Sequence, residues 1–248
     1  MIRIHADAVL RVLDGFTGRP LPPSALRCTV DGMPLRPIVK DGGYYILTNL
    51  PPGEHQVALD APRYAGERLT VPGDRRETLN VLVTMKPGEG YRFGAAVTWL
   101  TLHVTSGKKT PLPGQRVWIA AQNPLFELRI AQDAISKGDT GGRLFYPASI
   151  KTLSLPRDFL LLDGERSEVC RVEDLEEPCF AAPLGFDHKR GRSMFPAQVY
   201  TADGEGKIRA VFREPAMAGI LAEGEARPES FQLQPGENEM TLSLKGKK

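Results

Sequence analysis

Four histidines and three cysteines are the residues of this 248-residue chain best suited to catalysis or metal binding. They are His5, His55, His103, His188, Cys28, Cys170 and Cys179. No histidine begins a His-x-x-Glu sequence, and no cysteine has the Cys-x-x-Cys or Cys/His spacing of a zinc site. We therefore expect no metal site, and we expect the cysteines to be reduced, unrelated thiols rather than disulfide partners.

Sequence motifs for nucleophilic or phosphate chemistry are also missing. The chain contains no Gly-x-Ser-x-Gly elbow and no phosphate-binding loop, and the glycines at Gly88 and Gly90 lack the third member of a dinucleotide motif. The acidic pair Asp203 and Glu205 has no further oxygen ligands at the spacing of a calcium loop, so we expect a solvated turn there. We predict a protein that is not an enzyme, with no catalytic residue, no cofactor and no metal ion.

The remaining ligand-binding signals are weak. Trp99 and Trp118 could form a platform for stacking sugars, but both lie in expected strands, where we predict that they pack in the core. The basic stretch 187–192 is expected to be solvated. With 32 basic and 30 acidic residues the net charge is +2, which gives no reason to expect nucleic acid as a partner. No apolar run approaches the roughly 20 residues of a membrane span, so no membrane insertion is expected.

Short strands are the elements expected to position any site. The chain has 25 glycines and 21 prolines spread along its length, and apolar runs recur between these turn residues. Leu26–Val30 and Tyr44–Leu47 are examples of such runs. Tyr44 and Tyr45 must point to opposite faces of their strand, so one should enter the core and the other should lie outside. This pattern is typical of a β-sandwich.

The turn sequences indicate an internal repeat, with two copies of one sandwich in the chain. The corresponding pairs are Pro20 with Pro111, Gly42 with Gly204, and Pro72 with Pro235. Pro20 lies 21 positions before Asp41, whereas Pro111 lies 92 positions before Asp203, so the second copy contains about 71 extra residues. We place this insertion at residues 123–198. Within it we expect a helix over Pro124–Ile135 and a hairpin that turns at Asp163-Gly164.

Three segments of the first copy carry a family resemblance. These are Thr17–Pro22, Lys40–Tyr45 and Asn49–His55. In this order they resemble the carboxypeptidase regulatory-like domain, a transthyretin-like (prealbumin-like) seven-stranded sandwich, over residues 8–86. His55 stands where that family has an aromatic residue, and Pro23 stands where it has glycine. The second copy matches only through its ends.

The resemblance implies a module rather than an activity. Because no histidine begins a His-x-x-Glu sequence, we expect the zinc-dependent catalytic domain that such modules accompany in carboxypeptidases to be absent. Transthyretin-like hydroxyisourate hydrolases end in Tyr-Arg-Gly-Ser, whereas this chain ends in 242–248 with a different sequence. We therefore predict an all-β chain of two tandem Ig-like or transthyretin-like sandwiches. The first occupies residues 1–86, a linker spans 87–96, and the second occupies 97–248 around the insertion at 123–198.

A structural or adaptor protein that binds other protein subunits is the function that these features favour. Members of the family are usually secreted, but residues 1–7 carry charge where a secretory signal would be apolar. We therefore expect cytoplasmic synthesis, and we expect a component of a virion, such as a phage tail or baseplate, or of a contractile injection particle. The alternative is an accessory module that binds carbohydrate or peptide through the insertion. An enzyme built on the sandwich is a third and weaker alternative. The last four residues, 245–248, are expected to be disordered.

Overall fold

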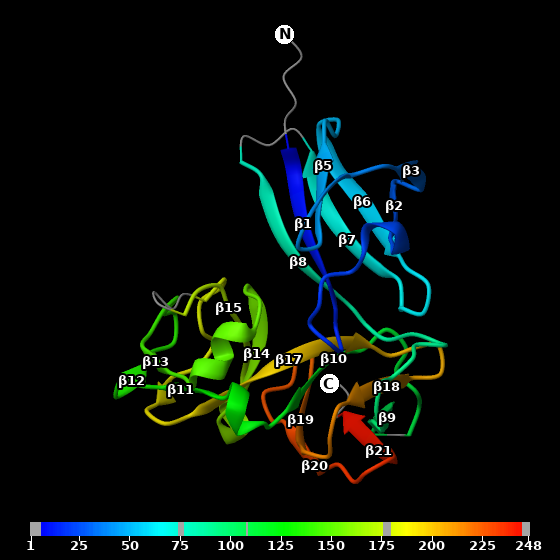
Figure 1. Cartoon of the computed structure of the whole chain (residues 1–248). Coiled ribbons are helices and arrows are strands. Elements are labelled where there is room, and N and C mark those ends of the chain that lie inside the picture. Colours follow the sequence, from blue (N-terminus) through cyan, green and yellow to red (C-terminus); the bar gives the residue numbers. More distant parts are fainter. Residues whose placement is uncertain (1–5, 74–76, 108, 176–179, 245–248) are drawn as a thin grey trace. The chain divides into compact units, whose positions relative to one another are not determined.

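The computed structural model describes residues 6–73, 77–107, 109–175 and 180–244. The chain divides into two compact units, residues 1–94 and 95–248 (Figure 1). The fold is all-β, as predicted, and each described helix is a short 3-10 turn. These turns are η1 (Pro23–Ala25), η2 (Pro124–Phe126), η3 (Ala148–Thr152) and η4 (Gly164–Arg166). None of the helices in the described ranges has the length and apolar character needed to cross a membrane. The finer predicted division, with a linker at 87–96, stays a prediction.

Two four-stranded sheets form the first unit. Its strands are β1 (Ala6–Asp14), β2 (Arg27–Val30), β3 (Met33–Leu35), β4 (Ile38–Lys40), β5 (Tyr44–Thr48), β6 (Gly53–Asp60), β7 (Glu67–Gly73) and β8 (Leu79–Met85). One sheet has the order β4-β5-β1-β8 and the other the order β3-β2-β6-β7. Leu10, Tyr45 and Leu59 come from both sheets and belong to one buried cluster, which makes the unit a sandwich. Tyr45 faces this core and Tyr44 faces outward, as the alternation predicts.

The second unit repeats this connectivity around a large insertion. The repeated strands are β9 (Thr98–Ser106), β10 (Arg116–Ala121), β18 (Lys207–Phe212), β19 (Met217–Ala222), β20 (Glu229–Gln232) and β21 (Glu237–Leu244). In the first unit, β1 lies between antiparallel β5 and parallel β8; in the second, β9 lies in the same way between β18 and β21. The series β2-β6-β7 likewise corresponds to β10-β19-β20.

A buried turn shows which residues of the two copies correspond. The Val12 N–H donates to the Gly43 carbonyl at 2.8 Å, and the Val104 N–H donates to the Gly206 carbonyl at the same distance. Both glycines have a positive φ, +80° for Gly43 and +74° for Gly206. A Cβ atom would lie 2.7 Å from the Val12 oxygen in one copy and 2.8 Å from the Val104 oxygen in the other. Only glycine fits both the backbone conformation and the space.

This register corrects two of the three pairs of corner residues proposed from the sequence. Pro20 and Pro111 do correspond, since each forms an isolated bridge with the strand of Val12 or Val104, at Leu13 and Thr105. The corresponding glycines are Gly43 and Gly206 rather than Gly42 and Gly204, because the second turn is one residue longer before its glycine. Pro72 lies within β7, whereas Pro235 lies between β20 and β21, so this pair does not correspond.

The insertion lies between β10 and β18, where the first unit has only β3 and β4. Its strands are β11 (Leu128–Ile130), β12 (Ala134–Ile135), β13 (Leu144–Phe145), β14 (Arg157–Leu162), β15 (Glu168–Val172), β16 (His188–Lys189) and β17 (Ser193–Thr201). β17 is shared: its first residues pair with β11 and β14 and its last five pair with β10 (Figure 1). Through β17 the insertion is a continuation of the sandwich sheet, and it has a buried cluster of its own.

One element of the insertion was predicted correctly and another wrongly. β14 and β15 pair as the predicted antiparallel hairpin, with η4 at its turn. The predicted helix over 124–135 is wrong, because this stretch contains η2, β11 and β12. Leu128 and Ile130 are both buried while Arg129 between them is exposed, which is the two-residue period of a strand. The helical spacing of the apolar residues was therefore coincidental.

Candidate interaction surfaces

The histidines in the described part of the chain lie in three separate places, each beside a carboxylate. His55 Nδ1 lies 2.6 Å from Asp31 Oδ2, and His103 Nε2 lies 2.7 Å from Glu239 Oε1. His188 lies between two carboxylates. Within the described ranges, no group of three or more His, Cys, Asp or Glu side chains is arranged to hold a metal ion. The structure therefore brings the histidines into ion pairs rather than into one site.

Two of the three cysteines can be placed. Cys28 and Cys170 are both free and buried. Burial raises the pKa of the Cys28 thiol to about 11, and burial together with nearby carboxylates raises the pKa of Cys170 further. Both are therefore thiols rather than nucleophilic thiolates at neutral pH. Cys179, His5 and the terminal residues 245–248 lie outside the described residues.

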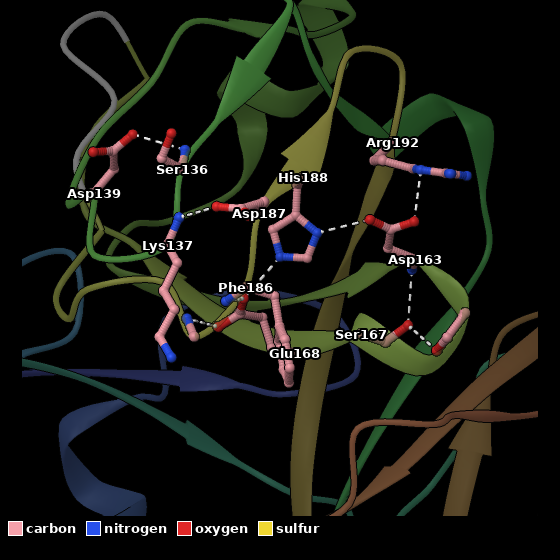
Figure 2. A network of polar contacts seen from close by, with 12 residues as sticks. Ser136, Lys137, Asp139, Asp163, Ser167, Glu168, Phe186, Asp187, His188 and Arg192 are labelled. Atoms are coloured by element: carbon pink, nitrogen blue, oxygen red, sulfur yellow. Dashed lines mark hydrogen bonds and ion pairs between the residues drawn. The ribbon is translucent and has the colours of Figure 1, made fainter.

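His188 is the centre of a buried polar network in the insertion (Figure 2). Its side chain is 0% exposed, with Nδ1 3.0 Å from Asp163 Oδ2 and Nε2 2.7 Å from Glu168 Oε1. Burial alone would lower the pKa of this imidazole, but its hydrogen bonds with Glu168 and Asp163 and their charges raise the pKa above its usual value. Both ring nitrogens can donate only when the ring is protonated, so the geometry suits an imidazolium ion.

Neighbouring groups hold the two carboxylates in place. Arg192 Nε lies 2.7 Å from Asp163 Oδ1, and the Gly185 N–H donates to Glu168 Oε2 at 2.8 Å. We call Asp163, Glu168, His188 and Arg192 the histidine clasp. Both nitrogens of its imidazole face a carboxylate, so neither is free to take a proton from a substrate. The clasp therefore acts as a structural tie between the β14–β15 hairpin and β16.

The stretch around β12 and β16 also borders a hollow. Asp133 and Arg190, which directly flank these strands, line an open depression of about 600 Å³. Arg143 and Phe145 also line it, and Phe145 is 56% exposed with the Arg190 guanidinium 6.0 Å from its ring centre. The basic stretch predicted to be solvated thus contains one fully buried residue, His188, and one residue of this hollow. Ligand binding by the insertion stays a prediction.

Neither tryptophan is fully buried, and the expectation of core packing holds only in part: Trp118 packs against the buried cluster of Ala120, Leu160, Phe195, Ala197 and Leu221, whereas Trp99 belongs to no buried cluster of the described residues. Both are half-buried, and each has a guanidinium over its ring: Arg209 at 4.2 Å from Trp99 and Arg116 at 4.9 Å from Trp118. The Trp118 indole also donates to Asp158 at 3.1 Å. The alternation of β9 and β10 turns both rings away from the sandwich core, which holds Leu100 and Val117; Trp118 thereby shares its face of β10 with Ala120 of the second cluster.

The sheet β4-β5-β1-β8 of the first unit has an unusually apolar outer face. Strand register aligns two adjacent rows across it. The rows are Ile38, Ile46, Val9 and Asn80, then Lys40, Tyr44, Arg11 and Leu82. Ile38 is 42% exposed and Tyr44 is 37% exposed, and the other apolar members are half-buried. We call these eight residues the apolar face. It contains two cations and no carboxylate.

The matching face of the second unit is polar. The register that equates Val12 with Val104 places Arg209 at the position of Ile46, Thr101 at that of Val9, and Lys207 at that of Tyr44. It also places His103, Thr241 and Glu239 at the positions of Arg11, Leu82 and Asn80. Acidic side chains lie beside all three of these residues: Arg209 pairs with Glu237 at 3.1 Å, Lys207 pairs with Glu205 at 2.7 Å, and His103 Nε2 lies 2.7 Å from Glu239 Oε1. The same scaffold thus has one apolar and one ion-paired outer face.

Asp14, at the end of β1, is the centre of a polar cluster in the first unit. Its carboxylate accepts hydrogen bonds from the Tyr91 hydroxyl at 2.5 Å, the Tyr64 hydroxyl at 2.9 Å and the N–H groups of Phe16 and Thr17. Burial alone would raise the pKa of Asp14, but the hydrogen bonds, that of Tyr91 foremost, lower it below its usual value. Burial and the Asp14 carboxylate raise the pKa of Tyr64 to about 12. Through Tyr91, this cluster ties the end of the first unit to its first strand.

We predict that Tyr91→Phe lowers the free energy of unfolding of the first unit by about 2 kcal/mol, because it removes a hydrogen bond to a buried carboxylate. The folded pKa of Asp14 is depressed, so its contribution is full above the ordinary value of 3.8 and is lost as the pH falls through the folded pKa. Urea unfolding at neutral pH and at about pH 3 should therefore show a smaller difference in acid. Tyr200→Phe, which removes a hydroxyl bonded to the neutral Gln198 amide, is the control. An equal loss at both pH values would contradict the prediction.

Neither the histidine clasp nor the apolar face was predicted from the sequence. The members of the histidine clasp are separated along the chain, and the pairing of β14 with β15 and with β17 brings them together. The apolar face did leave a signal. Val9 and Leu10 are adjacent apolar residues, as are Tyr45 and Ile46, and such runs indicate a strand with two apolar faces rather than one.

Comparison with known proteins gives little support for a family. No family model matches the chain, and no curated protein matches it. The carboxypeptidase regulatory-like resemblance is therefore supported only as far as an all-β, sandwich-like fold.

Several solved structures of pilins overlap most of the chain at low similarity. A streptococcal ancillary pilin is 11% identical with a TM-score of 0.27, over 96% of this chain and 60% of its own. The shaft pilin SpaA of Lactobacillus rhamnosus GG is 11% identical with a TM-score of 0.28, over 96% of this chain and 97% of its own. GBS52, the minor pilin of Streptococcus agalactiae, is 10% identical with a TM-score of 0.25, over 95% of this chain and 94% of its own.

TM-scores this low support no argument from the pilins to the binding partners of this chain. The matches do correct one expectation. The expectation of a cytoplasmic protein that joins a virion or an injection particle is contradicted, since the solved structures described above are pilins and none is a virion component.

Proposed function

We propose that this chain is a non-enzymatic structural or adaptor module, and that it holds another protein against the apolar face of its first unit. The observation that supports this most directly is the contrast between the two copies of the sandwich. Equivalent outer positions hold Val9, Ile46 and Leu82 in the first copy, and Thr101, Arg209 and Thr241 in the second. A resemblance to accessory domains of the carboxypeptidase regulatory-like type is in keeping with such a role.

The contrast shows that the scaffold itself does not require apolar residues at these positions. The second copy keeps the same strand pairing with polar and ion-paired side chains there. In the first copy, β1 and β5 present aliphatic side chains on both sides, although only one side faces the sandwich core. Contiguous exposed apolar surface of this kind is typical of sites that contact other proteins. Each aliphatic side chain buried there would contribute about 1 kcal/mol or more.

A photocrosslinking experiment in the cells that make the protein tests this proposal. A benzoylphenylalanine residue is placed at position 46 in one variant and at the matching position 209 in another. We expect a discrete protein adduct from position 46 and none from position 209, with the partner peptide identified by mass spectrometry. Equal adducts at both positions, or none at either, would overturn the proposal, and an adduct with a second copy of this chain would make the partner the protein itself.

A matched variant replaces three residues of the apolar face with the residues found at the matching positions of the second copy. Val9→Thr, Ile46→Arg and Leu82→Thr together reproduce residues that the same scaffold accommodates in the second unit. We expect the triple variant to unfold at nearly the same urea concentration as the wild type and to bind the crosslinked partner at least tenfold more weakly. The reciprocal variant, Thr101→Val with Thr241→Leu, should bind that partner as the wild type does.

A further inference from the structure

The charges on the apolar face identify the chemistry of its partner. Resting on the function proposed above, we infer that the partner presents a carboxylate side chain flanked by aliphatic side chains, and that Arg11 binds this carboxylate.

Arg11 lies in the middle of the apolar face with unused hydrogen-bonding capacity. Its register neighbours are Tyr44 on one side and Leu82 on the other, and its guanidinium lies 5.6 Å from the centre of the Tyr44 ring. Its Nε–H is shielded from solvent and has no hydrogen-bond partner among the described residues. A shielded donor left unpaired is unfavourable. Because Nε itself is shielded, a carboxylate of the partner would approach the guanidinium end-on and accept two hydrogen bonds from its terminal NH2 groups.

The charge balance of the face points to the same ligand. Arg11 and Lys40 contribute two positive charges to the apolar face, and within the described part of the chain neither forms an ion pair. On the matching face of the second unit, Arg209, Lys207 and His103 are all paired with acidic residues of the same unit. The first copy therefore lacks the carboxylates that the second copy supplies for itself, and a bound partner would supply them.

A second copy of the same face is a poorer match. Two apolar faces packed against each other about a twofold axis would place positive charges opposite positive charges, with no acidic residue on either side. An aliphatic segment that contains an aspartate or glutamate complements both the apolar side chains and the positive charges of the surface. Its aliphatic side chains would cover Ile38, Ile46 and Leu82, and its carboxylate would reach Arg11.

Selection from a phage-displayed library of random dodecapeptides tests the inference. The bait is the full chain, and the grafted triple variant is used to remove non-specific binders. We expect the selected peptides to contain aspartate or glutamate next to aliphatic residues. Synthetic versions should lose at least tenfold in affinity for Arg11→Gln, and they should lose little for Arg209→Gln, a cation on the matching face of the second unit. Urea unfolding of both variants checks that each is folded.

The outcomes separate this inference from the function on which it rests. Peptides that bind the wild type but not the graft, contain no acidic residue, and bind Arg11→Gln unchanged would overturn the inference and leave the proposed function standing. The inference would likewise be overturned, and the proposed function left standing, by a partner that is crosslinked at position 46 through a segment with no acidic residue. A library that yields no peptide specific for the wild type, together with no adduct at position 46, would overturn both.

Discussion

Replacing His188 with alanine is expected to lower the free energy of unfolding of the second unit by about 3 kcal/mol. The substitution removes the cation that lies between Asp163 and Glu168, whose side chains are only 11% and 17% exposed. Both carboxylates would keep their other partners but lose the charge that offsets their burial. It would also leave a cavity where the ring had been. Urea unfolding at pH 6, followed by a probe in the insertion, measures the effect.

A second histidine–glutamate pair in the same unit serves as the control. His103 lies 2.7 Å from Glu239, the same distance as His188 from Glu168, but the Glu239 side chain is 74% exposed. His103→Ala should therefore change stability by less than about 1 kcal/mol. Equal losses in the two variants would show that the histidine clasp contributes no more than a surface pair.

The pH dependence of the same variant has a definite sign. The folded pKa of His188 is raised above its ordinary value of 6.5, so its stabilisation is full below that value and is lost as the pH rises through the folded pKa. The difference between wild type and His188→Ala should thus be larger at about pH 6 than at about pH 9. A difference that grows with pH would contradict a protonated imidazole in the folded protein.

Replacing Gly206 with alanine is expected to destabilise the second unit by about 3 kcal/mol, through two separate effects. A left-handed backbone conformation is unfavourable by about 1 kcal/mol or more for alanine. In addition, the new Cβ would lie 2.8 Å from the Val104 carbonyl oxygen and 3.0 Å from the Leu112 nitrogen, so backbone atoms would have to move. Gly43→Ala should have the same effect in the first unit, where the Cβ would lie 2.7 Å from the Val12 oxygen.

Glycines in open turns allow the conformational effect to be measured without the steric one. Gly114 in the second unit has a φ of +76° and Gly18 in the first has a φ of +72°, and a Cβ at either would meet nothing within 4 Å. Gly114→Ala and Gly18→Ala should therefore show only the conformational effect, about 1 kcal/mol. If Gly206→Ala proved no worse than Gly114→Ala, the close approach to Val104 would have no energetic importance.

Local patterns in the sequence were enough to predict the sandwich. Turn residues delimit the strands, alternation separates Tyr44 from Tyr45, and the recurrence of Pro20 at Pro111 indicates a repeated unit. These signals work because turn conformation and strand alternation are decided by residues close together in the chain. The hairpin at Asp163-Gly164 was found for the same reason.

Features that depend on distant pairing were not predictable in this way. The spacing of Leu128, Ala131 and Ile135 fits a helix, but pairing of β11 with β13 and β17 makes the segment extended. His188 looks like part of a solvated basic stretch until strand pairing places it beside Asp163 and Glu168. Trp99 and Trp118 are large and apolar, yet the parity of their strands turns them away from the sandwich core, and only Trp118 packs against another buried cluster. Tertiary contacts, which no single-sequence pattern contains, decide each of these cases.

The parallel pairing of first and last strands has a mechanical consequence. β1 and β8 align over seven residue pairs, and β9 and β21 align over eight. In a parallel pair, the chain enters the first strand at one end and leaves the last strand at the other. A pull along the chain therefore loads all the hydrogen bonds of the pair in shear at the same moment, instead of peeling them apart one by one. In both units, therefore, tension between the ends would act along the paired strands rather than across them.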